Sequence, residues 1–109
     1  MNDEILSLYH SGDTLTASLQ GEIDHHSVTA VRMRMDDELL REKPKRLVID
    51  VGRVDFMDSS GLGLIMGRLA KVREYGGTLE IINASPRTVK MLKMAGLDRL
   101  IANERNTES

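Results

Sequence analysis

The sequence predicts a single α/β domain with a mixed β-sheet and helices packed over it. Three observations support this class: short apolar runs rich in β-branched residues, intervening segments with apolar residues at helical spacing, and glycine or proline between them. The expected order is β-β-α-β-α-β-α, with a possible final edge strand. A chain of 109 residues can bury one core, so we expect one domain at residues 1–102 and a polar C-terminal tail at 103–109.

The first two segments alternate between apolar and polar residues, as half-buried strands do. Residues 5–9 and 15–19 show this alternation, and residues 10–13, His-Ser-Gly-Asp, have the composition of a turn. We therefore expect a β-hairpin at the start of the chain.

A helical period follows the hairpin and reaches about Arg41. Its apolar face consists of Val28, Val31, Met35 and Leu39. Either Asp24 or Ser27 is suited to cap this helix, and Pro44 prevents it from continuing. The β-branched run at 46–51 then predicts a buried central strand, which makes the sheet at least partly parallel.

A second helix and a further strand follow the central strand. The helix is expected at 59–74, where Gly76-Gly77 ends it, and residues 78–82 form the strand. The apolar face of this helix is expected to consist of Leu62, Ile65, Met66, Leu69 and Val72.

The third helix has clear boundary signals. Ser85 is suited to cap it, Pro86 to occupy its first position, and Gly96 to adopt the left-handed conformation that ends helices. Residues 97–101 then form an edge strand or a last packing segment.

Composition excludes several classes of protein. There is no cysteine, so disulfides, thiolate metal sites and cysteine nucleophiles are excluded, which fits a reducing compartment. A net charge of −2 and three aromatic residues do not suit a nucleic-acid binder. Because no apolar run approaches the roughly 20 residues of a membrane span, we expect a cytoplasmic protein without a membrane partner.

The most informative segment is residues 54–63, which join the central strand to the middle helix. Asp58, Ser59 and Ser60 lie where this helix begins, and Asp and Ser are preferred capping residues. With Gly61 and Gly63 leaving the surroundings uncrowded, a phosphate would also find free backbone N–H groups here. Local chemistry alone leaves both functions open, with capping the more common one.

Known nucleotide and hydrolase motifs do not fit. In a G-x-G-x-x-G loop starting at Gly61, Met66 stands where the third glycine belongs. The Gly-Lys-Ser/Thr ending of a phosphate-binding loop is also missing. A Gly-x-Ser-x-Gly nucleophile elbow is also missing. Asp50 ends the central strand, but the hairpin start does not suit a receiver domain with a phosphoacceptor aspartate.

Two adjacent histidines, His25 and His26, are candidate metal ligands. Adjacent side chains point in different directions, and the third histidine, His10, is distant in the sequence. We therefore expect no metal site and no cofactor.

Several stretches together resemble the STAS domain, and within it the bacterial anti-sigma factor antagonists of the sporulation type. They are Gly-Glu-Ile-Asp-His-His at 21–26, Phe-Met-Asp-Ser-Ser-Gly-Leu-Gly at 56–63, Gly76-Gly77, and residues 85–97. The resemblance implies a non-enzymatic protein that binds an anti-sigma factor serine kinase and so frees a sigma factor. It also implies that the kinase phosphorylates Ser59, that the product no longer binds, and that a serine phosphatase restores binding.

The resemblance also implies a partner-binding surface. Its expected members are Asp24, His25, His26, Asp58, Ser59, Ser60 and Gly61. We expect a monomer when free, and a phosphate at Ser59 that blocks the complex without refolding the chain. Two alternatives remain: a constitutively bound STAS scaffold or transporter-associated module, and a nucleotide or anion sensor.

Overall fold

The computed structural model describes residues 5–102 and contains one four-stranded mixed sheet. The strands are β1 (Leu6–Ser11), β2 (Thr14–Ile23), β3 (Arg46–Met57) and β4 (Thr78–Ile82). They lie in the order β1-β2-β3-β4, with β1 antiparallel to β2 and the other two pairs parallel. The predicted α/β class and the order of the first seven elements are confirmed.

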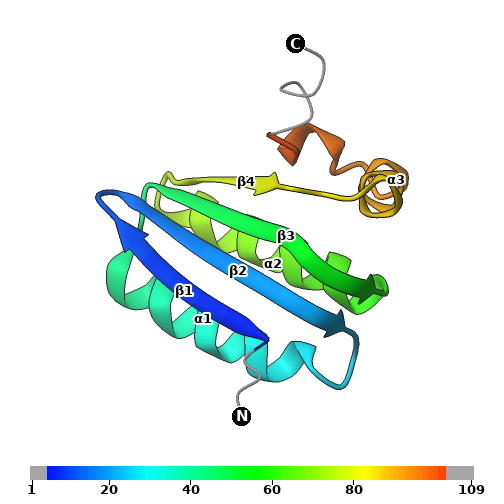
Figure 1. Ribbon diagram of the computed structural model, residues 1–109. Helices are drawn as coiled ribbons and strands as arrows, with labels where there is room; N and C mark the ends of the chain where they lie inside the picture. Colours follow the sequence, from blue (N-terminus) through cyan, green and yellow to red (C-terminus); the bar gives the residue numbers. More distant parts are fainter. Residues whose placement is uncertain (1–4, 103–109) are drawn as a thin grey trace.

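Two helices, α1 (Val28–Glu42) and α2 (Ser59–Glu74), lie side by side along one face of the sheet (Figure 1). Alternate residues of the strands face these helices and are almost fully buried. They include Leu15, Ala17, Leu19, Leu47, Ile49 and Ile81. Because each strand sends every second side chain to the same face, these residues form one continuous core beneath the helices.

The third helix, α3 (Pro86–Met94), lies at the β4 side of the sheet (Figure 1). The predicted cap is present, because the Ser85 hydroxyl accepts a hydrogen bond from the Thr88 amide at 3.2 Å. Gly96 has φ +75°, the left-handed conformation expected after this helix. No helix within residues 5–102 combines the length and apolar character that crossing a membrane requires.

Of the two alternatives for residues 97–101, the structure shows a last packing segment and not an edge strand, with a 3-10 turn at Asp98–Leu100. A single bridge between Ile81 and Ile101 is its contribution to the sheet. In a 3-10 turn, residues three apart lie on the same side, so Leu97 and Leu100 are both buried. The predicted tail at 103–109 lies outside the described residues.

The buried face of α2 differs from the predicted one. Its buried residues are Gly61, Leu64, Ile65, Arg68 and Val72. Met66, which was expected on the apolar face, is 52% exposed. The stripe at positions 61, 65, 68 and 72 was hidden in the sequence because it contains a glycine and an arginine, which do not mark an apolar face.

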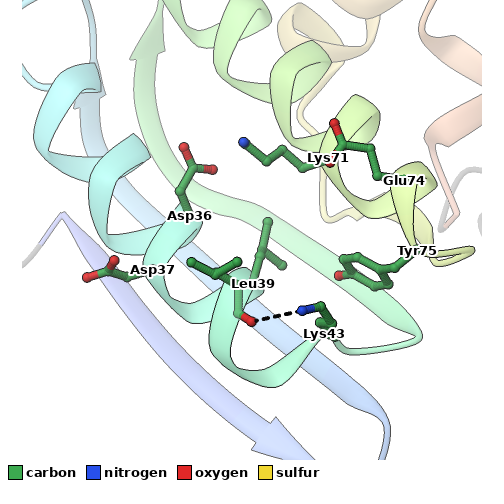
Figure 2. A pocket seen from close by; sticks show the side chains of 8 residues that line it. Asp36, Asp37, Leu39, Lys43, Lys71, Glu74 and Tyr75 are labelled. Carbon is green, nitrogen blue, oxygen red and sulfur yellow. Dashed lines mark hydrogen bonds between the residues drawn. The ribbon is translucent and has the colours of Figure 1, made fainter.

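A pocket of about 380 Å³ lies between the C-terminal halves of α1 and α2 (Figure 2). Leu39, Tyr75, Lys43 and Lys71 are among its lining residues. Burial raises the pKa of Tyr75, whose hydroxyl has no hydrogen-bond partner among residues 5–102. The pocket lies at the opposite end of α2 from Ser59, so it is separate from the segment that the sequence singled out.

Candidate partner-binding site

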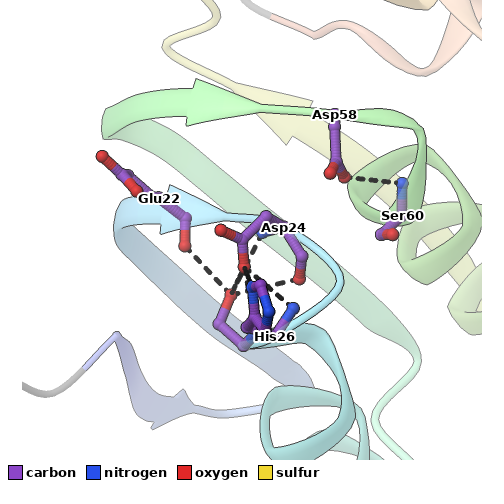
Figure 3. A network of polar contacts seen from close by, with 6 residues as sticks. Glu22, Asp24, His26, Asp58 and Ser60 are labelled. Carbon is purple, nitrogen blue, oxygen red and sulfur yellow. Dashed lines mark hydrogen bonds and ion pairs between the residues drawn. The ribbon is translucent and has the colours of Figure 1, made fainter.

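Two loops meet at the carboxyl ends of β2 and β3 (Figure 3). The strands are parallel neighbours, and their last residues, Ile23 and Met57, are paired in register. The Asp58 amide also donates a hydrogen bond to the Ile23 carbonyl at 3.3 Å. The loop after Ile23 and the loop after Met57 therefore emerge side by side, although more than 30 residues separate them in the sequence.

The second loop starts α2 and exposes Ser59. Asp58 is the N-cap in an extended conformation, and its carboxylate accepts a hydrogen bond from the Ser60 amide at 2.8 Å. Ser59 is the first residue of the helix and is exposed, whereas Ser60 is partly buried. Of the two serines, Ser59 therefore presents the more accessible hydroxyl.

The same contacts weigh against an anion pocket built from free amides. The Ser60 N–H is taken by Asp58, and the Gly61 N–H donates to the Asp58 carbonyl at 2.9 Å. The Asp58 carboxylate also places a negative charge where a bound anion would lie. These observations weaken the nucleotide or anion sensor as an alternative.

Gly61 and Gly63 have different roles. Gly61 is buried, and a Cβ atom there would overlap the side chain of Met57, which is itself only 6% exposed. The sequence expectation of uncrowded surroundings is therefore wrong for Gly61, which permits close packing of α2 on the end of β3. Gly63 is exposed, and a Cβ there would meet nothing within 4 Å among the described residues.

Replacing these two glycines with alanine is expected to have opposite effects on stability. Gly61→Ala forces the Met57 side chain to move in a packed core and should lower the free energy of unfolding by about 1–3 kcal/mol. Gly63→Ala adds only helix propensity and should raise it by up to about 1 kcal/mol. Urea unfolding of the two variants measures both effects. Equal stability of the two variants would contradict the packing role of Gly61.

The first loop is held by Asp24 and Ser27. The Asp24 carboxylate accepts hydrogen bonds from the amides of His26 at 3.0 Å and Ser27 at 3.1 Å. The Ser27 hydroxyl donates to the Glu22 carbonyl at 3.0 Å and accepts from the Asp24 amide at 3.1 Å. Ser27 occupies the N-cap position of α1, but its side chain makes no capping hydrogen bond to the helix, and the Asp24 carboxylate fixes the turn before the helix.

His25 and His26 are both exposed on this loop. Their rings lie 4.0 Å apart between centroids, and His26 Nδ1 lies 3.9 Å from an Asp24 carboxylate oxygen. Within residues 5–102, neither belongs to a group of three clustered metal-ligating side chains. The two rings are instead available for contact with another molecule.

The Asp24 turn is expected to hold above pH 3.8 and to loosen below it. Partial burial raises the pKa of the Asp24 carboxyl, but hydrogen bonds from Ser27 and His26 and the His26 charge outweigh burial, so the pKa lies below its ordinary value of 3.8. A carboxylate with a lowered folded pKa stabilises the fold above the unfolded value, and this contribution is lost as the pH falls through the folded value. NMR titration of the Ser27 amide should inflect below pH 3.8, and Asp24→Asn should remove the inflection. An inflection above pH 3.8 would contradict the assignment.

Phe56 lies beside the candidate site and was not among the residues that the sequence singled out. It is 46% exposed and is paired in register with Glu22, just before the first loop. Asp55 and Phe56 are both exposed whereas Met57 is buried, so burial does not alternate along the end of β3 and the sequence pattern gave no signal for an outward-facing phenyl ring. An exposed aromatic side chain beside two polar loops is typical of a protein-binding surface.

Comparisons with known proteins identify the family and the fold. The chain matches the STAS domain over residues 6–109. It is 37% identical over 101 residues to the anti-sigma F factor antagonist of Paenibacillus polymyxa, which covers 93% of this chain and 86% of that protein. The solved structure of the anti-sigma factor antagonist SpoIIAA in its unphosphorylated form has a TM-score of 0.82 and 28% identity, over 89% of this chain and 85% of that one. The Bacillus cell fate determinant SpoIIAA in the phosphorylated form has a TM-score of 0.75 and 27% identity, over 94% and 96% of the two chains.

The mixed sheet and the match over nearly the whole chain define a STAS domain, and the chain belongs to that family. Within the family it is similar to the bacterial anti-sigma factor antagonists, in agreement with the resemblance seen in the sequence.

Proposed function

We propose that this protein is an anti-sigma factor antagonist of a partner-switching system, controlled by phosphorylation of Ser59. The unphosphorylated form binds an anti-sigma factor that is also a serine kinase, and the bound kinase releases its sigma factor. Phosphorylation of Ser59 ends the interaction, and a serine phosphatase restores it. The observation that carries this proposal is the exposed Ser59 hydroxyl at the start of α2, beside the Asp24 loop.

The relatives support this assignment. The Paenibacillus polymyxa relative is an anti-sigma F factor antagonist, and SpoIIAA has solved structures in an unphosphorylated and a phosphorylated form. This chain has the same fold as both forms. A phosphorylation switch therefore has a counterpart among the proteins that this chain resembles.

The partner would contact the two loops together. Asp24, His25 and His26 supply one part of the surface, and Asp58, Ser59 and Ser60 supply the other. Gly61 contributes indirectly. It lets the start of α2 pack closely on Met57 and so helps to position the backbone of Ser59. In this function the chain is the substrate of the kinase, and ATP and the catalytic base belong to the partner.

Phosphorylation would change the complex more than the isolated fold. A phosphate adds about −1.5 to −2 charges, and a helix N-terminus favours an anion by roughly 0.3–1 kcal/mol, so the free protein should remain folded. In a complex the same group would be removed from water beside the Asp58 carboxylate. Burial of an unpaired anion and repulsion between like charges would both oppose binding.

The test is to incubate the protein with ATP and a purified serine kinase of the anti-sigma factor class from the same organism, and to measure intact and fragment masses. The expected result is one phosphate on Ser59, and loss of kinase binding by the modified form. Ser59→Ala should remain unmodified, whereas Ser60→Ala should still gain one phosphate. A kinase that binds the chain but leaves it unmodified would overturn the switch and favour a constitutive scaffold.

A further inference from the structure

A cluster of metal-ligating side chains lies outside the candidate partner-binding site, where β1 crosses α1. Its members are His10, Glu38 and Glu42, and one donor atom from each lies within 4.8 Å of the other two. His10 comes from β1, whereas the two glutamates are one helical turn apart on α1. The fold therefore joins a histidine to two carboxylates that lie 28 and 32 residues further along the chain.

The donor set suits a divalent transition ion. One imidazole nitrogen with two carboxylate oxygens is a combination that Zn²⁺ accepts, with water in the remaining position. All three side chains are reachable from solvent, because His10 and Glu38 have side-chain exposures of 39% and 14%, and Glu42 of 46%. The site can therefore be filled without opening the fold.

Two contacts orient Glu38, and the one with His10 would have to open for an ion to bind both side chains. One carboxylate oxygen, Oε2, contacts His10 Nε2, and the other, Oε1, accepts from Arg41 Nη2. Arg41 thereby fixes the rotation of the carboxylate while Oε2 stays directed at the imidazole. Hydrogen bonds of this kind commonly hold metal-ligating carboxylates in place.

Arg41 also opposes the site. Its Nε lies 3.8 Å from Glu42 Oε2, so a metal ion would have to compete with this guanidinium for the second glutamate. This contact is long, and Glu42 is exposed enough to turn toward His10. We expect the competition to weaken binding rather than to prevent it.

We propose that His10, Glu38 and Glu42 form a zinc site that fastens the β1–β2 hairpin to α1. Glu38 lies ten residues into α1, about 15 Å along the helix from its start near the Asp24 loop. The ion would therefore act on the stability of the fold without touching the proposed partner surface. This inference is independent of the proposed function.

Isothermal titration calorimetry with ZnCl2 on the chelator-treated, untagged full chain tests the site. We expect one equivalent to bind, and binding to weaken at least ~10-fold in His10→Ala and in Glu42→Gln. Asp37→Asn removes an exposed charge on the same helix outside the cluster and should leave binding unchanged. Zinc should also raise the melting temperature of the wild type by several degrees, and that of His10→Ala by much less.

A second measurement guards against variants that fail to fold. In the wild-type protein, the ring resonances of His10 should shift on addition of ZnCl2, while those of His25 and His26 shift less. Equal zinc affinity of His10→Ala and the wild type would overturn the proposal. Shifts confined to His25 and His26 would also overturn it and would place zinc on the loop after β2.

Discussion

Ser59→Asp should weaken binding to the anti-sigma factor kinase by more than about 100-fold, which corresponds to roughly 3 kcal/mol. The substitution places a fixed negative charge on the exposed first residue of α2, beside the Asp58 carboxylate. In the free protein this charge is solvated and lies at the favourable end of the helix dipole. In the complex it loses water, so the cost falls on binding rather than on folding.

Matched variants separate charge from size. Ser59→Asn has nearly the shape of the aspartate without its charge, and Ser59→Ala removes the hydroxyl, so both should retain most of the affinity. Calorimetry or surface plasmon resonance with the purified kinase measures all four proteins. Equal losses in the aspartate and asparagine variants would indicate a steric block, and equal affinity of all four would contradict a role for Ser59 at the interface.

The elements themselves were predictable because their signals are local. The strand at Thr78–Ile82 and the helix at Ser59–Glu74 fall where hydrophobic periodicity and glycine positions placed them. Ser85 acts through its hydroxyl, and Pro86 and Gly96 act through their backbone conformations. All three effects are local, so the boundaries of α3 could be predicted without knowledge of its tertiary neighbours.

The site was predictable only in part, because its geometry depends on strand neighbours. Capping chemistry alone identified Asp58 and Ser59 as the start of a helix, but the proximity of Asp24 follows from parallel pairing of Ile23 with Met57. Strand order is a property of the whole sheet, and local sequence patterns do not reveal it. Only the family resemblance placed the two loops in one surface before the fold was known.

Burial of polar and small residues was likewise hidden from the sequence. Gly61 and Arg68 lie on the buried face of α2, but neither contributes to an apolar periodicity. The contact of Gly61 with Met57 requires knowledge of how α2 turns away from β3. Arg68 pairs with Asp36 of α1. The sequence predicts the helix α1 but not which of its faces contacts α2.

Arg68 and Asp36 form an ion pair between α1 and α2. Arg68 Nε lies 3.0 Å from Asp36 Oδ1, and Arg68 is 4% exposed while the Asp36 side chain is 30% exposed. Burial lowers the pKa of Arg68, the Asp36 charge opposes this change, and Arg32 adds to it. Within residues 5–102, Arg68 Nε, Arg68 Nη1 and Asp36 Oδ1 are buried and make no hydrogen bond, so the charge of Asp36 is the main compensation for the buried guanidinium.

Asp36→Ala should therefore destabilise the fold by about 3 kcal/mol, because it leaves the guanidinium of Arg68 buried without its counterion. This value is the low end for a buried pair, since Asp36 keeps contact with water. Urea or thermal unfolding measures the change. Asp37→Ala removes an exposed acid at the next position of α1 and should change stability by less than about 0.5 kcal/mol.

The double variant Asp36→Ala with Arg68→Met distinguishes a lost attraction from an uncompensated charge. Methionine fills much of the arginine volume without a charge, so the double variant should recover most of the stability lost in Asp36→Ala. The pair would then serve to fix how α1 lies against α2 rather than to add net stability. The double variant should stay folded. Because each loop of the partner surface leads directly into one of these helices, its affinity for the kinase should nevertheless change. A double variant as unstable as Asp36→Ala would show instead that the carboxylate contributes through packing or other contacts of its own.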